Sequence, residues 1–316
     1  MTAFAFVFPG QGSQAVGMLD AWGDHPEVAL VLKEASDALG EDVGRLIQEG
    51  PKEALALTTN TQPVMLVAGV AAWRVWRAEG GALPSVVAGH SLGEYSALVA
   101  SGVLTLAQAA PLVRFRAAAM QEAVPVGTGA MAAILGMPAD QVIAGCAEAQ
   151  ATFATESGEV VEAVNFNDAA QTVIAGSKAA VDKACEVLKA SGAKRALPLP
   201  VSAPFHSSLM KPAADKLREK LATTVLAAPQ IPVVNNIDVS VETDADRIRD
   251  ALYRQAFGPV RWVECVKAIK ARGVSTLVEC GPGKVLAGMT KRIDAELTGA
   301  ALYEPASLAE VKTLLA

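Results

Sequence analysis

Positive charge is the scarcer kind in this sequence. Among its 316 residues, Lys and Arg number 27 and Asp and Glu number 33, which gives a formal net charge of −6. The chain thus lacks the excess of basic residues with which DNA- and RNA-binding domains attract phosphates. We therefore expect no nucleic acid partner, and a small anionic ligand would need a local cation.

Long hydrophobic runs are also missing. No apolar run reaches the roughly eighteen residues that span a membrane. The first apolar run, residues 4–8, stops at Pro9, and no basic stretch precedes it as it would in a secretory signal. These absences predict a cytoplasmic protein that does not bind membranes.

Cysteine is scarce and scattered, since no two of the four cysteines form a C-x-x-C pair. Neither a zinc site nor a disulfide framework is indicated. No nucleotide-phosphate motif occurs either, so we expect no metal and no cofactor. Four reduced thiols are expected, at Cys146, Cys185, Cys265 and Cys280.

What the chain does contain is typical of a packed globular protein, with 52% hydrophobic and 19% charged residues. Short apolar runs at 4–8 and 85–89 predict buried strands, and the long segments 61–79 and 105–124 predict helices. This alternation predicts an α/β fold, a large hydrolase-like domain with a mainly parallel sheet covered on both faces.

The middle of the chain has a different pattern. Here a strand and a helix are followed by two strands around a polar turn, then a helix at 178–191 and a last strand. This β-α-β-β-α-β order is that of a ferredoxin-like unit. We therefore predict a large α/β catalytic domain formed by residues 1–126 and 201–316, with an inserted ferredoxin-like subdomain at 127–200.

The segment Gly89-His90-Ser91-Leu92-Gly93 matches the pattern G-x-S-x-G between a predicted strand and a predicted helix. In this setting the glycines permit a sharp turn that projects a serine hydroxyl, and the helix start offers N–H groups to an oxyanion. Ser91 is therefore the candidate nucleophile for attack on a carbonyl. The alternative is a glycine-bounded helix cap in which Ser91 only bonds the backbone.

A serine nucleophile needs a base, and the chain has only three histidines. His25 lies in a polar segment predicted to face solvent, and His90 lies inside the turn itself. His206 lies at a loop-to-helix junction, from which an imidazole can reach another loop. We therefore predict that His206 is the base. No carboxylate is obviously placed to orient it, which favours a backbone carbonyl as its partner.

Taken together, the motifs resemble those of a known family. FPGQGSQ at 8–14, GHSLGEY at 89–95, NFN at 165–167 and GPG at 281–283 are similar to motifs of the malonyl-CoA:acyl-carrier-protein transacylases of bacterial type II fatty acid synthesis. The likeness runs nearly end to end. It implies an acyltransferase that moves malonyl from malonyl-CoA to acyl carrier protein through a malonyl-serine ester, in a ping-pong mechanism for fatty acid biosynthesis. Coenzyme A would enter only as part of the substrate.

The resemblance also implies roles for single residues. The backbone N–H groups of Gln11 and Leu92 would form the oxyanion hole. Arg116 would bind the free malonyl carboxylate through its planar guanidinium, although its position alone also fits a solvated helix charge. Phe205 would leave little room for a methyl branch and so disfavour methylmalonyl.

Four further residues match family positions that support the substrate or the base. Gln62, which the sequence alone places at a helix start, matches an active-site glutamine. Asn165 and Asn167 would bond the acyl or pantetheine amides, and the alternative is that they only form a turn. The main-chain carbonyl of Gln255 would hold the catalytic histidine.

Acyl carrier proteins of this pathway are acidic, so docking on an acidic enzyme would need a local basic patch. The candidates are Lys284, Lys291 and Arg292, with Lys194 and Arg195 nearby in the family arrangement. The alternative for such a charge run is a solvated face.

Two other functions stay open at this stage. Esterases and thioesterases share the G-x-S-x-G turn, but α/β-hydrolases usually place an acidic residue between the serine and the histidine on a contiguous sheet. A noncatalytic carrier-binding protein would not be expected to retain Gln11, Ser91, Arg116 and His206 together.

Overall fold

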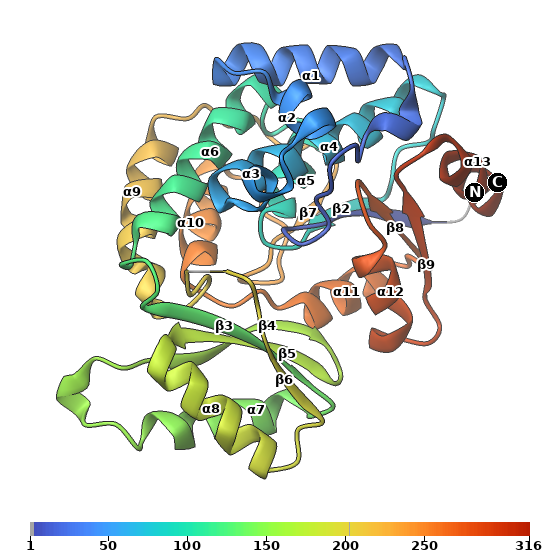
Figure 1. Ribbon diagram of the computed structural model, residues 1–316. Helices are drawn as coiled ribbons and strands as arrows, with labels where there is room; N and C mark the ends of the chain where they lie inside the picture. The colour runs from blue at the N-terminus through green and yellow to red at the C-terminus, as the bar shows by residue number, and fades with distance from the viewer. Residues whose placement is uncertain (1–2, 202) are drawn as a thin grey trace. The chain divides into compact units, whose positions relative to one another are not determined.

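The computed structural model describes residues 3–201 and 203–316 and divides into two compact units (Figure 1). Unit 1 holds the chain up to Ala117 together with Thr223–Ile248 and Cys265–Ala316, and unit 2 holds Ala118–Ala222 and Arg249–Glu264. Each unit has its own sheet.

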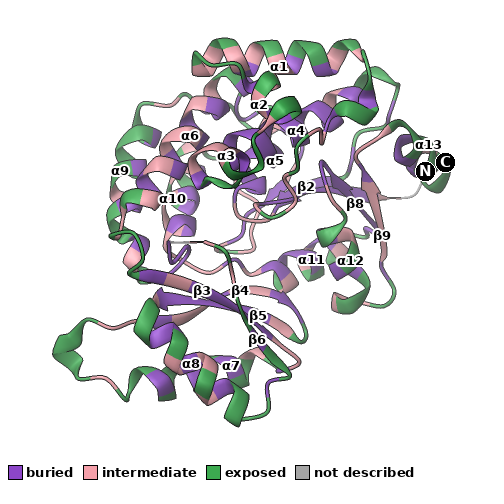
Figure 2. Ribbon diagram, in the orientation of Figure 1, coloured by how far each residue is buried: buried purple, intermediate pink, exposed green. Residues whose placement is uncertain are grey.

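Unit 1 is built on a five-stranded parallel sheet in the order β7-β2-β1-β8-β9. All five residues of β1 and of β8 are buried, and the labelled strand β8 is purple in Figure 2. Strands buried on both faces are characteristic of a parallel sheet between helices, so the predicted α/β class is confirmed. The strands are β1 (Phe4–Phe8), β2 (Val86–Gly89), β7 (Val233–Val234), β8 (Thr276–Cys280) and β9 (Thr298–Leu302).

The long helix α4 packs on this sheet through two tryptophans. Its Trp73 and Trp76 pack edge-to-face on Phe6 of β1, with ring centroids 5.7 and 5.4 Å apart. The helix begins at Thr58, a few residues before the predicted start. The helices that begin in unit 1 are η1 (Asp20–Trp22), α1 (Pro26–Leu39), α2 (Val43–Glu49), α3 (Lys52–Ala56), α4 (Thr58–Ala78), α5 (Gly93–Ala100), α6 (Leu106–Glu122), α10 (Ala245–Ala256), α12 (Val285–Ile293) and α13 (Pro305–Leu315).

Unit 2 contains a four-stranded antiparallel sheet in the order β4-β5-β3-β6. With α7 after the first strand and α8 after the third, this is the predicted ferredoxin-like order. The two helices and the sheet enclose an apolar core that includes Ile134, Val142 and Leu188. The elements that begin in unit 2 are β3 (Gly129–Leu135), α7 (Ala139–Gln150), η2 (Thr155–Ser157), β4 (Val161–Asp168), β5 (Gln171–Ser177), α8 (Lys178–Ala190), β6 (Arg195–Pro198), η3 (Ser208–Met210), α9 (Lys211–Ala222) and α11 (Trp262–Ala271).

The ferredoxin-like sheet lies within the segment 127–200 that the sequence marked as an insertion, whereas unit 2 also takes in neighbouring segments on both sides. In the described residues, no helix is long and apolar enough to cross a membrane. All four cysteines are free, as expected; three are buried and Cys185 is half-buried.

Candidate active site

The predicted nucleophile turn is present at the end of β2. Ser91 follows the strand with a φ of 52°, a strained value for a residue other than glycine, and α5 begins two residues later. The flanking glycines are required by close packing. A Cβ atom added at Gly89 would lie 1.8 Å from the carbonyl carbon of Gly93, and one added at Gly93 would lie 2.0 Å from the Phe8 oxygen. The turn therefore forms only with glycine at both positions.

The N–H groups of this turn are almost all engaged. Those of Gly93, Glu94 and Tyr95 donate to the carbonyls three residues before them, and that of Ser91 donates to Oδ1 of Asn236 at 2.7 Å. Within the turn, these bonds leave the N–H of Leu92 for another acceptor. This is the group that the resemblance assigned to the oxyanion hole.

Arg116 of α6 lies beside the nucleophile, and its side chain is not solvated as the helix position alone suggested. The residue is only 1% exposed. Nη2 donates to Oγ of Ser91 at 3.3 Å, and the guanidinium carbon lies 5.5 Å from the centre of the Tyr95 ring. A cation is thus fixed within one hydrogen bond of the serine hydroxyl.

Burial shifts the pKa values of both Arg116 and Tyr95. Loss of solvation lowers the pKa of Arg116 from its ordinary value, and the nearby Tyr95 and Glu94 oppose that shift. Burial also raises the pKa of Tyr95 to about 12, so the phenol is neutral at physiological pH. The charge available to a ligand here is that of the guanidinium.

Gln62 connects Arg116 to the glycine-rich loop after β1. Its Oε1 accepts a hydrogen bond from Nη1 of Arg116 at 2.6 Å, and its Nε2 donates to Oε1 of Gln11 at 3.2 Å. Gln62 is buried in the second turn of α4 rather than at the helix start. Four residues predicted for the site, Gln11, Gln62, Ser91 and Arg116, therefore form one connected cluster within unit 1.

His206 belongs to unit 2, where a backbone carbonyl orients its ring. Nδ1 lies 2.8 Å from the main-chain oxygen of Gln255, the contact that the resemblance implied. Because a carbonyl only accepts, Nδ1 carries the hydrogen in the neutral ring and Nε2 keeps its lone pair. His206 is 4% exposed, and its φ of 68° is again strained.

The comparisons with known proteins decide the family. A model of the acyl transferase domain matches residues 5–302. The chain is 55% identical over 314 residues to the malonyl CoA-acyl carrier protein transacylase of Salmonella typhimurium, covering 99% of this chain and 100% of that protein. The chain belongs to this transacylase family. The enzyme is therefore an acyltransferase.

Solved structures agree with this assignment. The acyl-carrier-protein S-malonyltransferase of Burkholderia pseudomallei 1710b matches the acyltransferase with a TM-score of 0.96 and 64% identity, over 99% of this chain and 100% of that one. A malonyl-transacylase solved in complex with its type II PKS acyl-carrier protein matches with a TM-score of 0.94 and 52% identity, over 98% of each chain.

The remaining predicted residues of the acyltransferase lie in two places. Phe205 is buried next to the histidine, and Asn165 and Asn167 lie towards the end of β4, where Asn165 bridges to Val260. These residues belong to unit 2. The predicted docking cations are all exposed: Lys284, Lys291 and Arg292 in unit 1, and Lys194 and Arg195 in unit 2.

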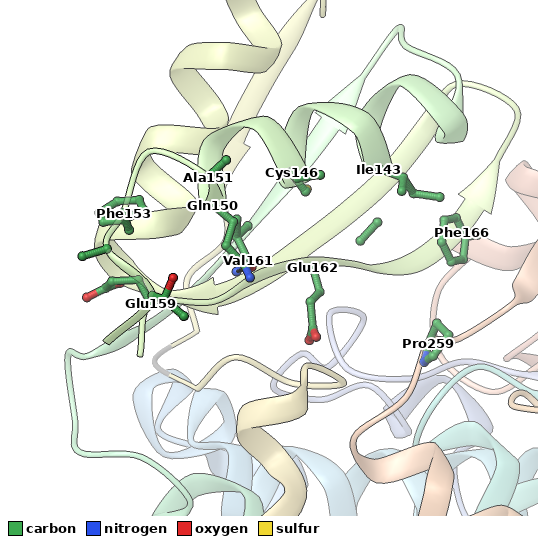
Figure 3. Close-up of a pocket in the computed structure, with 14 residues that line it drawn as sticks. Ile143, Cys146, Gln150, Ala151, Phe153, Glu159, Val161, Glu162, Phe166 and Pro259 are labelled. Carbon is green, nitrogen blue, oxygen red and sulfur yellow. Dashed lines mark hydrogen bonds between the residues drawn. The ribbon is translucent and has the colours of Figure 1, made fainter. Parts of the chain in front are cut away.

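Unit 2 of the acyltransferase also holds a cavity of about 810 Å³ between α7 and β4 (Figure 3). Cys146 and Gln150 line it from α7, and Val161 and Phe166 line it from β4. Its described lining residues include none of those predicted for the reaction. The cavity is therefore not part of the candidate active site.

Two residues around the acyltransferase nucleophile were missed by sequence reasoning. Asn236 bonds the turn through its side chain, and Oε2 of Glu94 accepts the backbone N–H of Asn236 at 2.9 Å. Both are buried. One sequence feature could have indicated Asn236: a pair of asparagines directly follows the apolar run 231–234. Polar side chains at the end of a buried strand are usually hydrogen-bonded to a specific partner. His25, expected to face solvent, is instead half-buried and caps α1 by accepting from the N–H of Glu27 at 3.2 Å.

Proposed function

We propose that this acyltransferase transfers the malonyl group from malonyl-CoA to the phosphopantetheine thiol of acyl carrier protein through an ester on Ser91, for fatty acid biosynthesis. The observation that carries the proposal is the buried guanidinium of Arg116, 3.3 Å from the Ser91 hydroxyl. Membership of the transacylase family supports the same substrates. We further propose that the enzyme works in the cytoplasm and needs no cofactor.

Arg116 accounts for the choice of a dicarboxylic acyl group. In a malonyl ester, one methylene separates the ester carbonyl from the free carboxylate, so a cation next to the serine oxygen is within reach of that carboxylate. A guanidinium-carboxylate pair is directional, and it is strongest where water is excluded. An acetyl group offers no carboxylate and would leave the buried cation without this partner, so malonyl is selected.

The proton transfers fall to His206. In the first half of the reaction, Nε2 of His206 takes the Ser91 proton while Oγ bonds to the thioester carbon, and the imidazolium then gives the proton to the departing CoA thiolate. In the second half, His206 takes the proton of the carrier thiol, whose sulfur bonds to the acyl carbon. Ser91 leaves as the alcohol with the proton from the imidazolium. This scheme requires Nε2 to approach Oγ within hydrogen-bond distance.

Two backbone groups would stabilise the tetrahedral intermediates. The N–H of Leu92, left over by the hydrogen bonds of the turn, and the N–H of Gln11, whose side chain is held by Gln62, are the proposed donors. Removal of one such donor typically costs about 3 to 4 kcal/mol of transition-state stabilisation. Phe205, Asn165 and Asn167 are proposed to shape and bond the acyl and pantetheine portions.

Intact-mass spectrometry after brief exposure to malonyl-CoA tests the nucleophile and the acyl selectivity together. The wild-type enzyme should gain one malonyl group and little acetyl from acetyl-CoA in a parallel sample. Ser91→Ala should gain neither, whereas Ser85→Ala, a change at an exposed serine before β2, should behave like the wild type. Full labelling of Ser91→Ala would rule out the assignment.

The same samples distinguish transfer from hydrolysis. With a phosphopantetheine-bearing carrier protein present, the malonyl group should appear on the carrier thiol. Free malonate formed at the same rate with and without carrier would identify a hydrolase instead.

A further inference from the structure

The nucleophile turn follows β2 at the point where the pairing between β2 and its neighbour β7 ends. Beside β2 lies β7, which has only two residues, and the register pairs Val87 with Val233 and Ala88 with Val234. Pairing between these two strands ends there: Gly89 still pairs with Phe8 of β1 on its other side, but it has no partner residue in β7. Backbone groups at the turn would therefore lack the partners that a longer strand would supply, at a cost of about 1 to 3 kcal/mol for each buried group left unpaired.

The side chain of Asn236 takes the place of that missing strand. Oδ1 accepts from the N–H of Ser91 at 2.7 Å, and Nδ2 donates to the carbonyl of Gly89, also at 2.7 Å. An amide offers one acceptor and one donor at this spacing, whereas an ionised carboxylate only accepts and a hydroxyl has a single donor on a shorter arm. Asn236 is fully buried at 0% exposure, so both bonds are made away from solvent.

The main chain of Asn236 is held in turn by the helix that follows the nucleophile. Its N–H donates to Oε2 of Glu94 at 2.9 Å. Glu94 lies in the first turn of α5, three residues after Ser91. Asn236 therefore forms hydrogen bonds with Gly89 and Ser91 and, through Glu94, with α5.

We infer that Asn236 is a positioning residue for the nucleophile: its amide holds Ser91 at positive φ and keeps the Ser91 N–H turned away from the substrate, so that Leu92 presents the oxyanion donor. The inference rests on the proposed function, because it assigns Asn236 a role in acyl transfer through Ser91. Without the two bonds, the turn can relax towards a less strained φ and move the hydroxyl away from its attacking position. A displacement of about 1 Å costs on the order of 10²-fold in rate.

Three variants test the inference. Asn236→Ala removes both bonds, and Asn236→Asp keeps the acceptor for the Ser91 N–H but loses the donor to Gly89. Asn235→Ala is the matched control, because Asn235 is also buried and its side chain bonds to neighbours in its own turn: Oδ1 accepts from the Asp238 N–H at 2.8 Å, and Nδ2 donates to Oγ of Ser240 at 3.2 Å.

The measurement is the single-turnover rate of Ser91 acylation by malonyl-CoA at saturation, with KM and the unfolding midpoint measured for the same preparations. Asn236→Ala should acylate on the order of 10²-fold more slowly with KM changed less than about threefold. Asn235→Ala should lose comparable stability and keep the wild-type rate.

Asn236→Asp supplies a second readout that a general loss of stability would not produce. A protonated carboxyl, like the amide, offers one acceptor and one donor, and burial favours the protonated form. The ratio of the Asn236→Asp rate to the wild-type rate should therefore rise as pH falls. Three ionisable groups face this residue: Glu94, which accepts from the N–H of residue 236, and beyond it Arg116 and Tyr95. Because the wild type and the variant both contain these groups, the ratio of the two rates removes their common effect on the pH dependence.

The outcomes separate the two proposals. If wild-type Ser91 is not acylated, the proposed function is wrong. If the wild type is acylated but folded Asn236→Ala matches its rate, or Asn235→Ala slows equally, the positioning role is wrong. If Asn236→Ala does not fold, the Asn236→Asp ratio decides, and a ratio that does not change with pH overturns the inference.

Discussion

Arg116 shows how much a single buried charge can determine. Its guanidinium bonds Ser91 and Gln62 inside unit 1, where burial lowers its pKa. A ligand carboxylate would restore part of the lost solvation, and charge-assisted hydrogen bonds contribute about 1.5 to 3 kcal/mol. Arg116→Ala should therefore lower kcat/KM for malonyl-CoA by about 10 to 150-fold and leave the value for acetyl-CoA unchanged or higher.

The check is the ratio of kcat/KM for the two thioesters. Arg116→Lys should recover only part of the ratio, because an ammonium keeps the charge without the planar fork. Arg114→Ala is the control, since Arg114 lies on the same helix and pairs with Glu41 instead. A malonyl-to-acetyl ratio that stays at the wild-type level in Arg116→Ala would remove Arg116 from substrate selection.

Single residues differ in how far the sequence predicts them. Ser91 could be predicted because its constraints are local: a strand, two glycines and a helix start within a few positions. The carboxylate-binding role of Arg116 and the choice of Gln255 as the carbonyl partner of His206 came only from the family resemblance. Asn236 was missed because its partner Ser91 is 145 positions away and no local pattern connects them.

At the scale of elements, the contact between β1 and α5 leaves no room for a side chain. A Cβ at position 93 would lie 2.0 Å from the carbonyl oxygen of Phe8, a backbone atom that cannot move without its strand. Gly93→Ala should lower the free energy of unfolding by about 3 kcal/mol or more. Gly288→Ala in α12 should have the opposite sign and stabilise by about 0.5 to 1 kcal/mol, because its nearest atom would be 3.8 Å away. Denaturant midpoints of the two variants measure both, and equal shifts would contradict the steric argument.

Glu279 of β8 is a buried residue whose carboxyl group couples stability to pH. Glu279 ends near the helix N-terminus, where Oε2 accepts from the Ala287 N–H at 2.9 Å, but burial raises its pKa from 4.5 to about 7. Between these values the folded chain holds a proton that the unfolded chain has lost. Stability is therefore greater at the acidic end of this window and falls as pH rises through it, by up to about 3 kcal/mol.

Glu279→Gln removes this titration. The unfolding midpoint of the variant relative to the wild type should rise from about pH 5 to about pH 7 and level off by about pH 8. Parallel midpoint curves for the two proteins over this range would show that Glu279 is ionised in both the folded and unfolded chain.

Element boundaries show where the sequence signal weakens. The helix expected over residues 61–79 begins at Thr58, because Pro63 is accommodated inside α4 although proline favours a first turn. The apolar run 231–234 has the composition of a buried strand, but within it only Val233 and Val234 pair with β2. In each case the element type followed from composition, and its end depended on tertiary partners that are distant in sequence.

At the scale of the whole molecule, the order of elements was sufficient to predict two sheets of different kinds. Strand-helix alternation requires a parallel sheet, and the β-α-β-β-α-β segment requires an antiparallel one. The boundaries between domains are harder to place, since α6, α10 and α11 each cross from one compact unit to the other. The division at 127–200 stays a prediction.

The net charge of the enzyme bears on how an acidic carrier protein can dock. An enzyme of charge −6 repels an acidic carrier protein at long range, so any attraction must come from a local patch, proposed at the exposed Lys291 and Arg292 near the end of α12. Reversal of both to Glu should lower kcat/KM for the carrier by about tenfold or more at low salt and weaken its salt dependence. Lys33→Glu with Arg45→Glu is the control, because both residues are exposed on α1 and α2 and each reversal lowers the charge by two, so both double variants reach −10.

If the patch docks the carrier, only the Lys291 and Arg292 variant should slow the second half-reaction, and the rate of Ser91 acylation by malonyl-CoA should stay at the wild-type value in both. Equal slowing in the two double variants would show that total charge, rather than a docking patch, controls the encounter. Slower acylation in the Lys291 and Arg292 variant would assign these cations to the phosphates of CoA, because each half-reaction meets a different anionic partner at the same serine.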